Sequence, residues 1–190
     1  MIKVNILILL LITGIVSCSS KEDIDLLKIT EKYYKALDES DTSLIKTLLQ
    51  DSLLTRENEY NYEQKFAKEE YVEWIRWDSV FDPSYEILEI KQIENTVKIK
   101  ISKKDKRVLF LHEKPIVTNQ VVHFNKNKIA LVETVEYVVY NDSLFVRNRQ
   151  RFLDWIDKNH PELAGVIYDQ TRIGGMKYLR AIELYQKKNH

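Results

Sequence analysis

Two acidic residues stand where the neighbouring sequence is apolar, which makes them candidates for acid–base chemistry. Glu133 belongs to a stretch over 128–140 with the period-two pattern of a strand, and that pattern puts it on the apolar face. Asp78 lies one helical turn after Trp74, on the apolar side of an expected helix. A carboxylate in such a place is costly unless it is paired or protonated. Facing a pocket, either group could have a raised pKa and act as a general base.

Each acid also has a structural interpretation. The face that carries Glu133 could open to water where the sheet curls, or an arginine could pair with it. Asp78 could bond to backbone amides at the end of its helix, or pair with an arginine such as Arg107. Perturbed acids are often structural, so both interpretations stay open.

Two histidines could supply the partner of such a base. His112 alternates with Val108 and Phe110 in one expected strand, and His123 has apolar alternate neighbours in the next. Imidazole titrates near neutral pH, so either ring could act as an acid or base in a pocket. The Tyr137 hydroxyl is a further candidate partner. The competing interpretation is that both histidines are hydrogen-bonded core residues.

Aromatic residues recur around the expected interface between helices and sheet, and could line a ligand cavity. The candidates are Tyr71, Trp74, Trp77, Phe110 and Tyr137. An aromatic stripe is also the normal content of a hydrophobic core, and that is the default interpretation.

The sequence carries no spacing typical of a metal or cofactor site. His-x-x-x-His, His-Glu-x-x-His and clustered carboxylates do not occur, so we expect no metal. Gly174-Gly175 lacks the preceding strand and the third glycine of a phosphate-binding loop, so no nucleotide cofactor is expected. Gly-x-Ser-x-Gly, which marks a serine nucleophile, does not occur either.

Hydrophobic periodicity indicates the elements that must position these residues. Apolar spacings of three and four predict helices at 24–37, 42–49, 68–80, 145–156 and 176–187. A period of two predicts strands at 85–93, 96–102, 107–112, 115–124 and 128–140. Residues 52–62 are expected to be extended or irregular. The turns between the strands are too short for parallel crossovers, so these strands should pair antiparallel.

The order of these elements resembles the nuclear-transport-factor-2-like (SnoaL-like) family. ITEKYYKALDESDTSLIKTLLQD resembles the first two helices of that family, and FAKEEYVEWIRWDSVF resembles its third. The resemblance covers residues 24–140. It implies an α+β fold in which three N-terminal helices pack on a strongly curved, cone-shaped antiparallel sheet with a pocket between them. Members include isomerases, cyclases, dehydratases and ligand binders, so the fold alone does not choose a function.

Residues 141–190 depart from the family pattern. A typical member ends at or soon after the sheet, so this segment is expected to form extra C-terminal helices packed on the same domain. It could cover the sheet, cap the cone or meet a partner.

The N-terminal stretch has the composition of a secretory leader. Lys3 precedes an apolar run over 6–12 that is too short to cross a bilayer, which needs about 20 residues. Ile15-Val16-Ser17-Cys18 resembles the lipobox of bacterial lipoproteins. The resemblance implies a signal peptide over 1–17, lipidation of Cys18 and a tether over 18–23. Two or three acyl chains on Cys18 would anchor the protein stably to a membrane.

The tether adds a signal for location. Lys21-Glu22-Asp23 resembles the lysine-plus-acid motif that sends some lipoproteins to the cell surface. We therefore expect a lipid-anchored protein of the cell envelope, on the outer membrane, facing the periplasm or the surface.

The charge balance argues against a nucleic-acid partner. The chain has 29 Lys and Arg and 29 Asp and Glu, and loss of Lys3 with the leader leaves 28 against 29, a net charge of −1. No basic footprint for nucleic acid remains. Cys18 is the only cysteine, so the mature chain has neither a disulfide nor a thiolate metal site. The length suits one domain.

Three functions fit these observations. The favoured one is a lipid-anchored, non-catalytic module that binds a small apolar ligand or an envelope protein, because no acid–base pair is fixed by spacing. The second is an isomerase or cyclase that uses a pocket carboxylate as its base. The third is a structural subunit of an envelope complex that docks through residues 141–190. A homodimer is compatible with each.

Overall fold

The computed structural model, which describes residues 25–187, begins with two helices that acidic side chains cap. Asp25 accepts a backbone N–H at the start of α1 (Leu26–Asp38), and Asp41 accepts two at the start of α2 (Thr42–Leu48). Such caps satisfy amides that have no partner inside the helix. Tyr33, Tyr34 and other residues spaced by three and four bury one face of α1.

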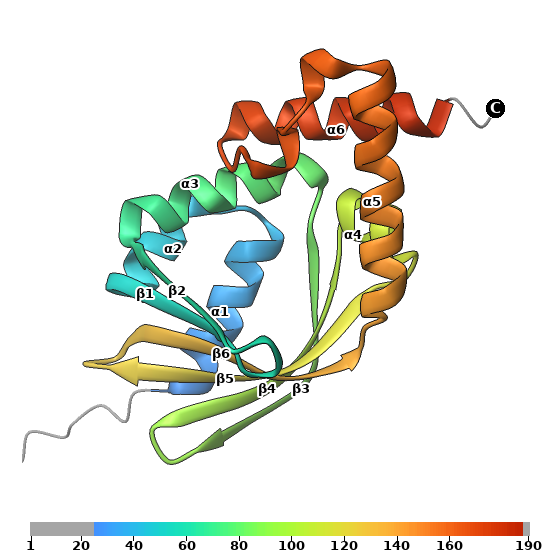
Figure 1. Ribbon diagram of the computed structural model, residues 1–190. Coiled ribbons are helices and arrows are strands. Elements are labelled where there is room, and N and C mark those ends of the chain that lie inside the picture. The colour runs from blue at the N-terminus through green and yellow to red at the C-terminus, as the bar shows by residue number, and fades with distance from the viewer. Residues whose placement is uncertain (1–24, 188–190) are drawn as a thin grey trace, which may run out of the picture.

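Six strands form one sheet in the order β2-β1-β6-β5-β4-β3 (Figure 1). The strands are β1 (Leu49–Glu57), β2 (Tyr62–Ala67), β3 (Ser84–Ile93), β4 (Thr96–Lys104), β5 (Ile116–Asn125) and β6 (Lys128–Val139). Strands β3 to β6 pair antiparallel, as the sequence predicts, whereas β1 and β6 pair in parallel. The sheet is therefore mixed. Register shifts interrupt the β1–β6, β3–β4 and β5–β6 pairs, and such bulges bend a sheet.

Helices cover the inner face of this curved sheet. α3 (Lys68–Asp78) lies where the sequence predicts a third helix and packs with α1 and α2 over the strands. Their apolar faces and the inward side chains of the sheet form one buried cluster, which includes Ile45, Ile75, Ile99 and Val122. The predicted fold class, α+β with helices packed on a strongly curved sheet, is confirmed.

One prediction of secondary structure was wrong. The predicted strand at 107–112 is a helix, α4 (Lys106–His112), because Asp105 caps it by accepting the Val108 N–H at 2.5 Å. Its buried residues are Val108, Leu111 and His112, which have helical spacing. The alternation of Val108, Phe110 and His112, which predicted a strand, is too short to exclude a helix. The segment 52–62, expected to be extended or irregular, forms most of β1, the turn after it and the first residue of β2, and β1 and β2 pair as a hairpin.

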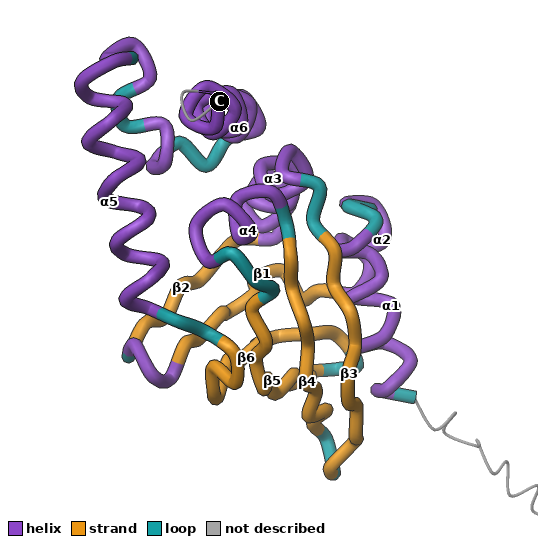
Figure 2. The backbone as a smooth tube through the Cα atoms, turned by 90° about the vertical axis from the view of Figure 1, so that its right-hand side faces the viewer, coloured by secondary structure: helices purple, strands orange, loops and turns teal. Residues whose placement is uncertain are grey.

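The C-terminal segment adds two long helices, α5 (Asp142–Asn159) and α6 (Arg172–Lys187), and a second buried cluster. In that cluster Phe152 and Tyr178 pack on Trp77, in the last turn of α3, and on Phe81, in the short turn that follows α3. α6 comes close to α3, because a Cβ on Gly175 would lie 3.1 Å from the Trp77 carbonyl oxygen. Figure 2 shows α5 standing along one side of the sheet, away from α1 and α2.

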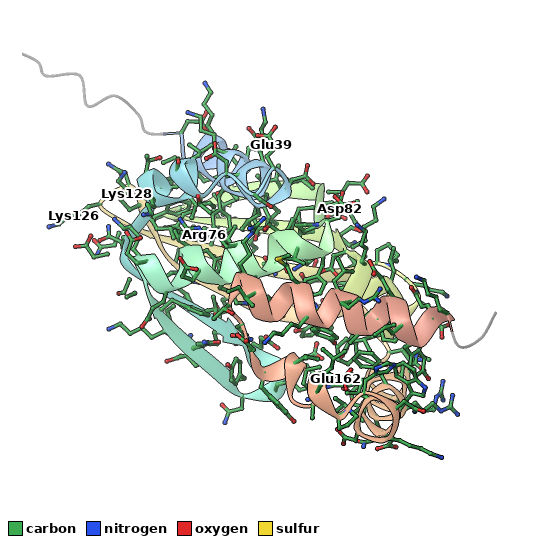
Figure 3. The ribbon with its side chains drawn as sticks, turned by 90° about the horizontal axis from the view of Figure 1, so that it is seen from above. Glu39, Arg76, Asp82, Lys126, Lys128 and Glu162 are labelled. Atoms are coloured by element: carbon green, nitrogen blue, oxygen red, sulfur yellow. The ribbon has the colours of Figure 1, made fainter. Side chains whose placement is uncertain are left out.

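Charged side chains cover the outside of these layers. Figure 3 labels Glu39, Arg76 and Glu162, which are exposed on the helical side of the molecule. Within residues 25–187, no helix combines the length and the apolar character needed to span a bilayer. The leader, Cys18 and the tether lie outside the described residues.

Candidate functional site

A cavity of about 400 Å³ lies between α1, α3 and the inner face of the sheet. Tyr33 and Tyr34 reach it from α1, and Tyr71 and Trp74 reach it from α3. The sheet contributes side chains from β1, β3, β4, β5 and β6, and the start of α5 closes one side. Among the described α-helices and strands, all except α2, β2 and α6 contribute a side chain to the lining of this cavity.

Tyrosines form its inner wall. The Tyr33 and Tyr71 hydroxyls lie 2.5 Å apart, and the Tyr34 hydroxyl donates to the Gln120 side chain. Tyr71 also stacks on Trp74, with ring centroids 5.5 Å apart. Burial raises the pKa of Tyr33, Tyr34 and Tyr71 well above the ordinary value, so these hydroxyls stay protonated. The inner wall thus offers aromatic rings and neutral hydroxyl groups.

A buried charge cluster of two acids and two bases (Asp78, Lys103, Asp105 and Arg107) forms a second wall. The Lys103 ammonium donates to both oxygens of Asp78, at 2.7 and 3.0 Å, and lies 3.6 Å from Asp105. Arg107 lies 3.4 Å from Asp105 and 3.9 Å from Asp78. Burial would lower the pKa of Arg107, but the charges of Asp105 and Asp78 outweigh it and raise the pKa. The formal charges of the cluster cancel.

Asp78 is therefore an ion-pair partner in this cluster. It also accepts the Tyr85 hydroxyl at 3.0 Å, and Lys103 and Arg107, rather than Asp78, line the cavity. The sequence left open a pair with an arginine such as Arg107, and the structure adds Lys103 as the closer base.

Glu57 and three aromatic rings form the outer end of the cavity, where the side chains are only half-buried. The Tyr137 hydroxyl donates to Glu57 at 2.8 Å, and the rings of Tyr140 and Phe145 continue from Tyr137 at centroid distances of 5.0 and 5.7 Å. Burial, followed by the charge of Glu57, raises the pKa of Tyr137. Sequence reasoning missed Glu57, although Leu53, Thr55 and Glu57 already alternate in the printed sequence.

Glu133 and His123 do come together, but away from the cavity. The His123 Nε2–H donates to Glu133 at 3.0 Å, and Arg56 lies 3.6 Å from the same carboxylate. A register shift after His123 leaves Ile129 and Val132, three residues apart, as the buried side chains of β6. Glu133 follows Val132 and points to the outer face, contrary to the strict alternation that the sequence predicts.

The electrostatics of Glu133 agree with this position. Partial burial would raise the pKa of Glu133, but hydrogen bonds from His123 and Asn58 and the charge of Arg56 hold the pKa below its ordinary value. The sequence left three interpretations open for Glu133: a base with a raised pKa, a position on a face that opens to water, and pairing with an arginine. In the structure Glu133 lies on the outer face and pairs with Arg56.

His112 has a structural environment. It is buried on α4, its Nδ1 lies 2.9 Å from the Lys114 carbonyl oxygen, and the Asn141 N–H donates to its Nε2 at 2.8 Å. These two bonds assign the proton to Nδ1. The ring connects α4 to the residue that caps α5.

The predicted aromatic lining divides into two groups. Tyr71, Trp74 and Tyr137 line the cavity. Trp77 and Phe110 instead pack in the second cluster, where Phe110 contacts Phe152 with centroids 5.1 Å apart. Sequence could not separate the groups, because the C-terminal helices that cover the second group lie far away in the chain. In residues 25–187 no group of three or more His, Cys, Asp or Glu side chains is placed to hold a metal ion.

Neither protein-family models nor curated protein sequences give a match to this chain. Solved structures do. A protein from Kribbella flavida assigned as a ketosteroid isomerase is 8% identical and has a TM-score of 0.49, and the match covers 62% of this chain and 80% of that one. An NTF2-like protein of unknown function from Cytophaga hutchinsonii is 14% identical with a TM-score of 0.49, covering 62% and 93%. Another from Burkholderia xenovorans is 12% identical with a TM-score of 0.48, covering 59% and 81%.

Proposed function

We propose that this protein is a lipid-anchored envelope protein that binds a small, largely apolar molecule in the cavity between α1, α3 and the sheet. The cavity itself carries the proposal. Its volume of about 400 Å³ lies in the range of small-molecule sites, and its walls are aromatic with a few placed polar groups. The aromatic pair Tyr71–Trp74 and the Tyr137 ring both face this space.

Binding is favoured over turnover by what the titratable side chains already do. Glu133 and His123 point to the other face of the sheet. Both oxygens of Asp78 accept hydrogen bonds from Lys103, and both ring nitrogens of His112 are bonded to backbone groups. None of the four residues that the sequence suggested as catalytic presents a free atom to the cavity.

A cavity-filling substitution tests the proposal. Thr134 points into the cavity from β6, whereas the next residue, Val135, is exposed on the outer face of the same strand. Thr134→Phe should fill the cavity, and Val135→Phe adds the same ring outside it. We expect native mass spectrometry of the full-length protein, extracted gently from its own membranes, to show a bound small molecule.

The two variants show whether the bound molecule occupies the cavity. Thr134→Phe should lose it and Val135→Phe should keep it, with both variants folded by circular dichroism. A bound mass that survives in Thr134→Phe, or a wild-type protein that carries none and binds nothing from a lipid and metabolite extract, would contradict the proposal.

The anchor is a separate part of the proposal and rests on the sequence around Cys18. The described chain begins at the end of the molecule opposite α6 (Figure 1). Cys18→Ser should move the protein from the membrane fraction to the soluble fraction and remove the lipid mass from its N-terminal peptide. Intact mass with an unmodified residue 18 in the wild type would contradict the anchor and leave the cavity proposal standing.

A further inference from the structure

We propose that the molecule bound in the cavity carries a positively charged group, an ammonium or a guanidinium, that docks against Glu57. This inference rests on the proposed binding function and narrows its ligand class. It comes from comparing the charged side chains that line the cavity with the partners that each one already has.

The basic residues of the lining already have acidic partners. Lys103 lies against Asp78 at 2.7 Å, and Arg107 lies 3.4 Å from Asp105. Arg56 is directed to Glu63, 2.8 Å away, and to Glu133 on the outer face. An anionic ligand would have to compete with these carboxylates for each base.

Glu57 is the exception. It lies on the cavity side of β1 and accepts a hydrogen bond from the Tyr137 hydroxyl. Among residues 25–187, no Lys, Arg or His forms an ion pair with it, although every basic residue of the lining has one. The outer end of the cavity therefore carries an uncompensated negative charge. A half-buried carboxylate gains most from a partner of opposite charge, and the ligand is the partner that the cavity can admit.

The rings beside Glu57 suit the same charge. Tyr137, Tyr140 and Phe145 follow one another at centroid distances of 5.0 and 5.7 Å, and all three line the cavity. Aromatic faces attract cations, and an ammonium or guanidinium over these rings would also reach the carboxylate. Burial is the main cause that raises the pKa of Tyr140, and Tyr60, Asp142 and Glu57 raise it further, so acidic groups lie near the ring at this end. Among residues 25–187, no Lys or Arg side chain lies over any of these three rings.

Three probes of one shape separate charge from apolar contact. Tryptamine, tryptophol and indole-3-propanoate share an indole body and differ in a cationic, neutral or anionic end. We expect the full-length protein in detergent, titrated by calorimetry, to bind tryptamine at least about tenfold more tightly than tryptophol, the scale of one charged hydrogen bond. The anion should bind more weakly still. Added salt should lower the affinity for tryptamine and leave the affinity for tryptophol unchanged.

The variant Glu57→Gln should remove the preference for tryptamine. Its matched control is Glu31→Gln, an equal loss of charge at an exposed position on α1, which should keep the preference. If Glu57→Gln does not fold, the salt dependence of the wild type and the order of its affinities for the three probes still decide the question.

The outcomes separate this inference from the function on which it rests. Equal binding of tryptamine and tryptophol, tighter binding of indole-3-propanoate, or an unchanged preference in Glu57→Gln would overturn the cationic ligand. Where Thr134→Phe still blocks those probes, the cavity remains a binding site. No binding of any probe would count against both.

Discussion

The buried charge cluster allows a quantitative prediction, because removing one of its bases leaves a buried acid without its ion-pair partner. Lys103→Met takes away the ammonium that lies 2.7 Å from Asp78, whose side chain is only 4% exposed. At an effective dielectric of about 20, two charges at that distance attract by about 6 kcal/mol. Much of that attraction offsets the cost of taking both charges out of water.

The net effect of the substitution is smaller than the attraction but still large. Breaking a buried pair by removing one partner costs about 3–5 kcal/mol, because the remaining charge is uncompensated. Arg107 is 3.9 Å from Asp78 and shared with Asp105, so it recovers part of the loss. We therefore expect about 3 kcal/mol, or a fall of about 6–12 °C in Tm for a domain of this size.

The same strand supplies a matched control. Lys100 on β4 pairs with Glu89 at 3.1 Å, but the Glu89 side chain is 72% exposed. Lys100→Met should cost at most about 1 kcal/mol, the scale of a surface pair. Urea denaturation followed by circular dichroism measures both values.

A double variant tests the cause. Asp78→Asn together with Lys103→Met leaves the Asp105–Arg107 pair neutral, and should recover much of the stability lost in Lys103→Met alone. Two results would contradict a compensated charge network. One is a loss of unfolding free energy in Lys103→Met no larger than in Lys100→Met. The other is a double variant that is less stable than Lys103→Met by the full cost of a second ion pair.

Two further predictions concern the outer face and α6. The folded-state pKa of Glu133 is below its ordinary value of 4.5, so its stabilisation is present above that pH and disappears as pH falls through the folded pKa. Glu133→Gln should therefore lower Tm at pH 7, and its Tm should approach that of the wild type as the pH falls well below 4.5. A constant difference across a Tm–pH series would contradict this. A Cβ on Gly174 would lie 2.1 Å from the Asp169 carbonyl oxygen, so Gly174→Ala should cost about 1–3 kcal/mol by urea denaturation, and an unchanged midpoint would contradict the close approach.

The sequence predicts those parts of the fold that depend on interactions between residues close together in the chain. The caps at Asp25 and Asp41, the alternation of Val97, Ile99 and Ile101, and the Asn125–Lys128 turn all act within a few residues, and these elements lie where periodicity predicts them. The parallel pair of β1 with β6 joins residues about eighty positions apart. Nothing in either segment specifies that partner, so the parallel pair was not predicted.

The candidate site was predicted in part for the same reason. Tyr71 and Trp74 were found because a helix fixes which residues share a face. Glu133 was misplaced because one register shift after His123 changes which side chains point inward, and a sequence shows no shift. Trp77 was assigned to the lining because the helices that bury it come seventy or more residues later. Glu57 was missed because its significance depends on Tyr137, which lies on the neighbouring strand β6 but eighty residues later in the chain.

The central claim is that the cavity between α1, α3 and the sheet is a ligand site. A crystal structure of the full-length protein, purified from its own membranes without displacement of bound molecules, tests it most directly. The account predicts electron density for a small molecule between the Tyr71–Trp74 pair and Tyr137, with its polar end at Glu57. A cavity that has closed, with Trp74 and Tyr137 packed against each other and no space between them, would contradict it.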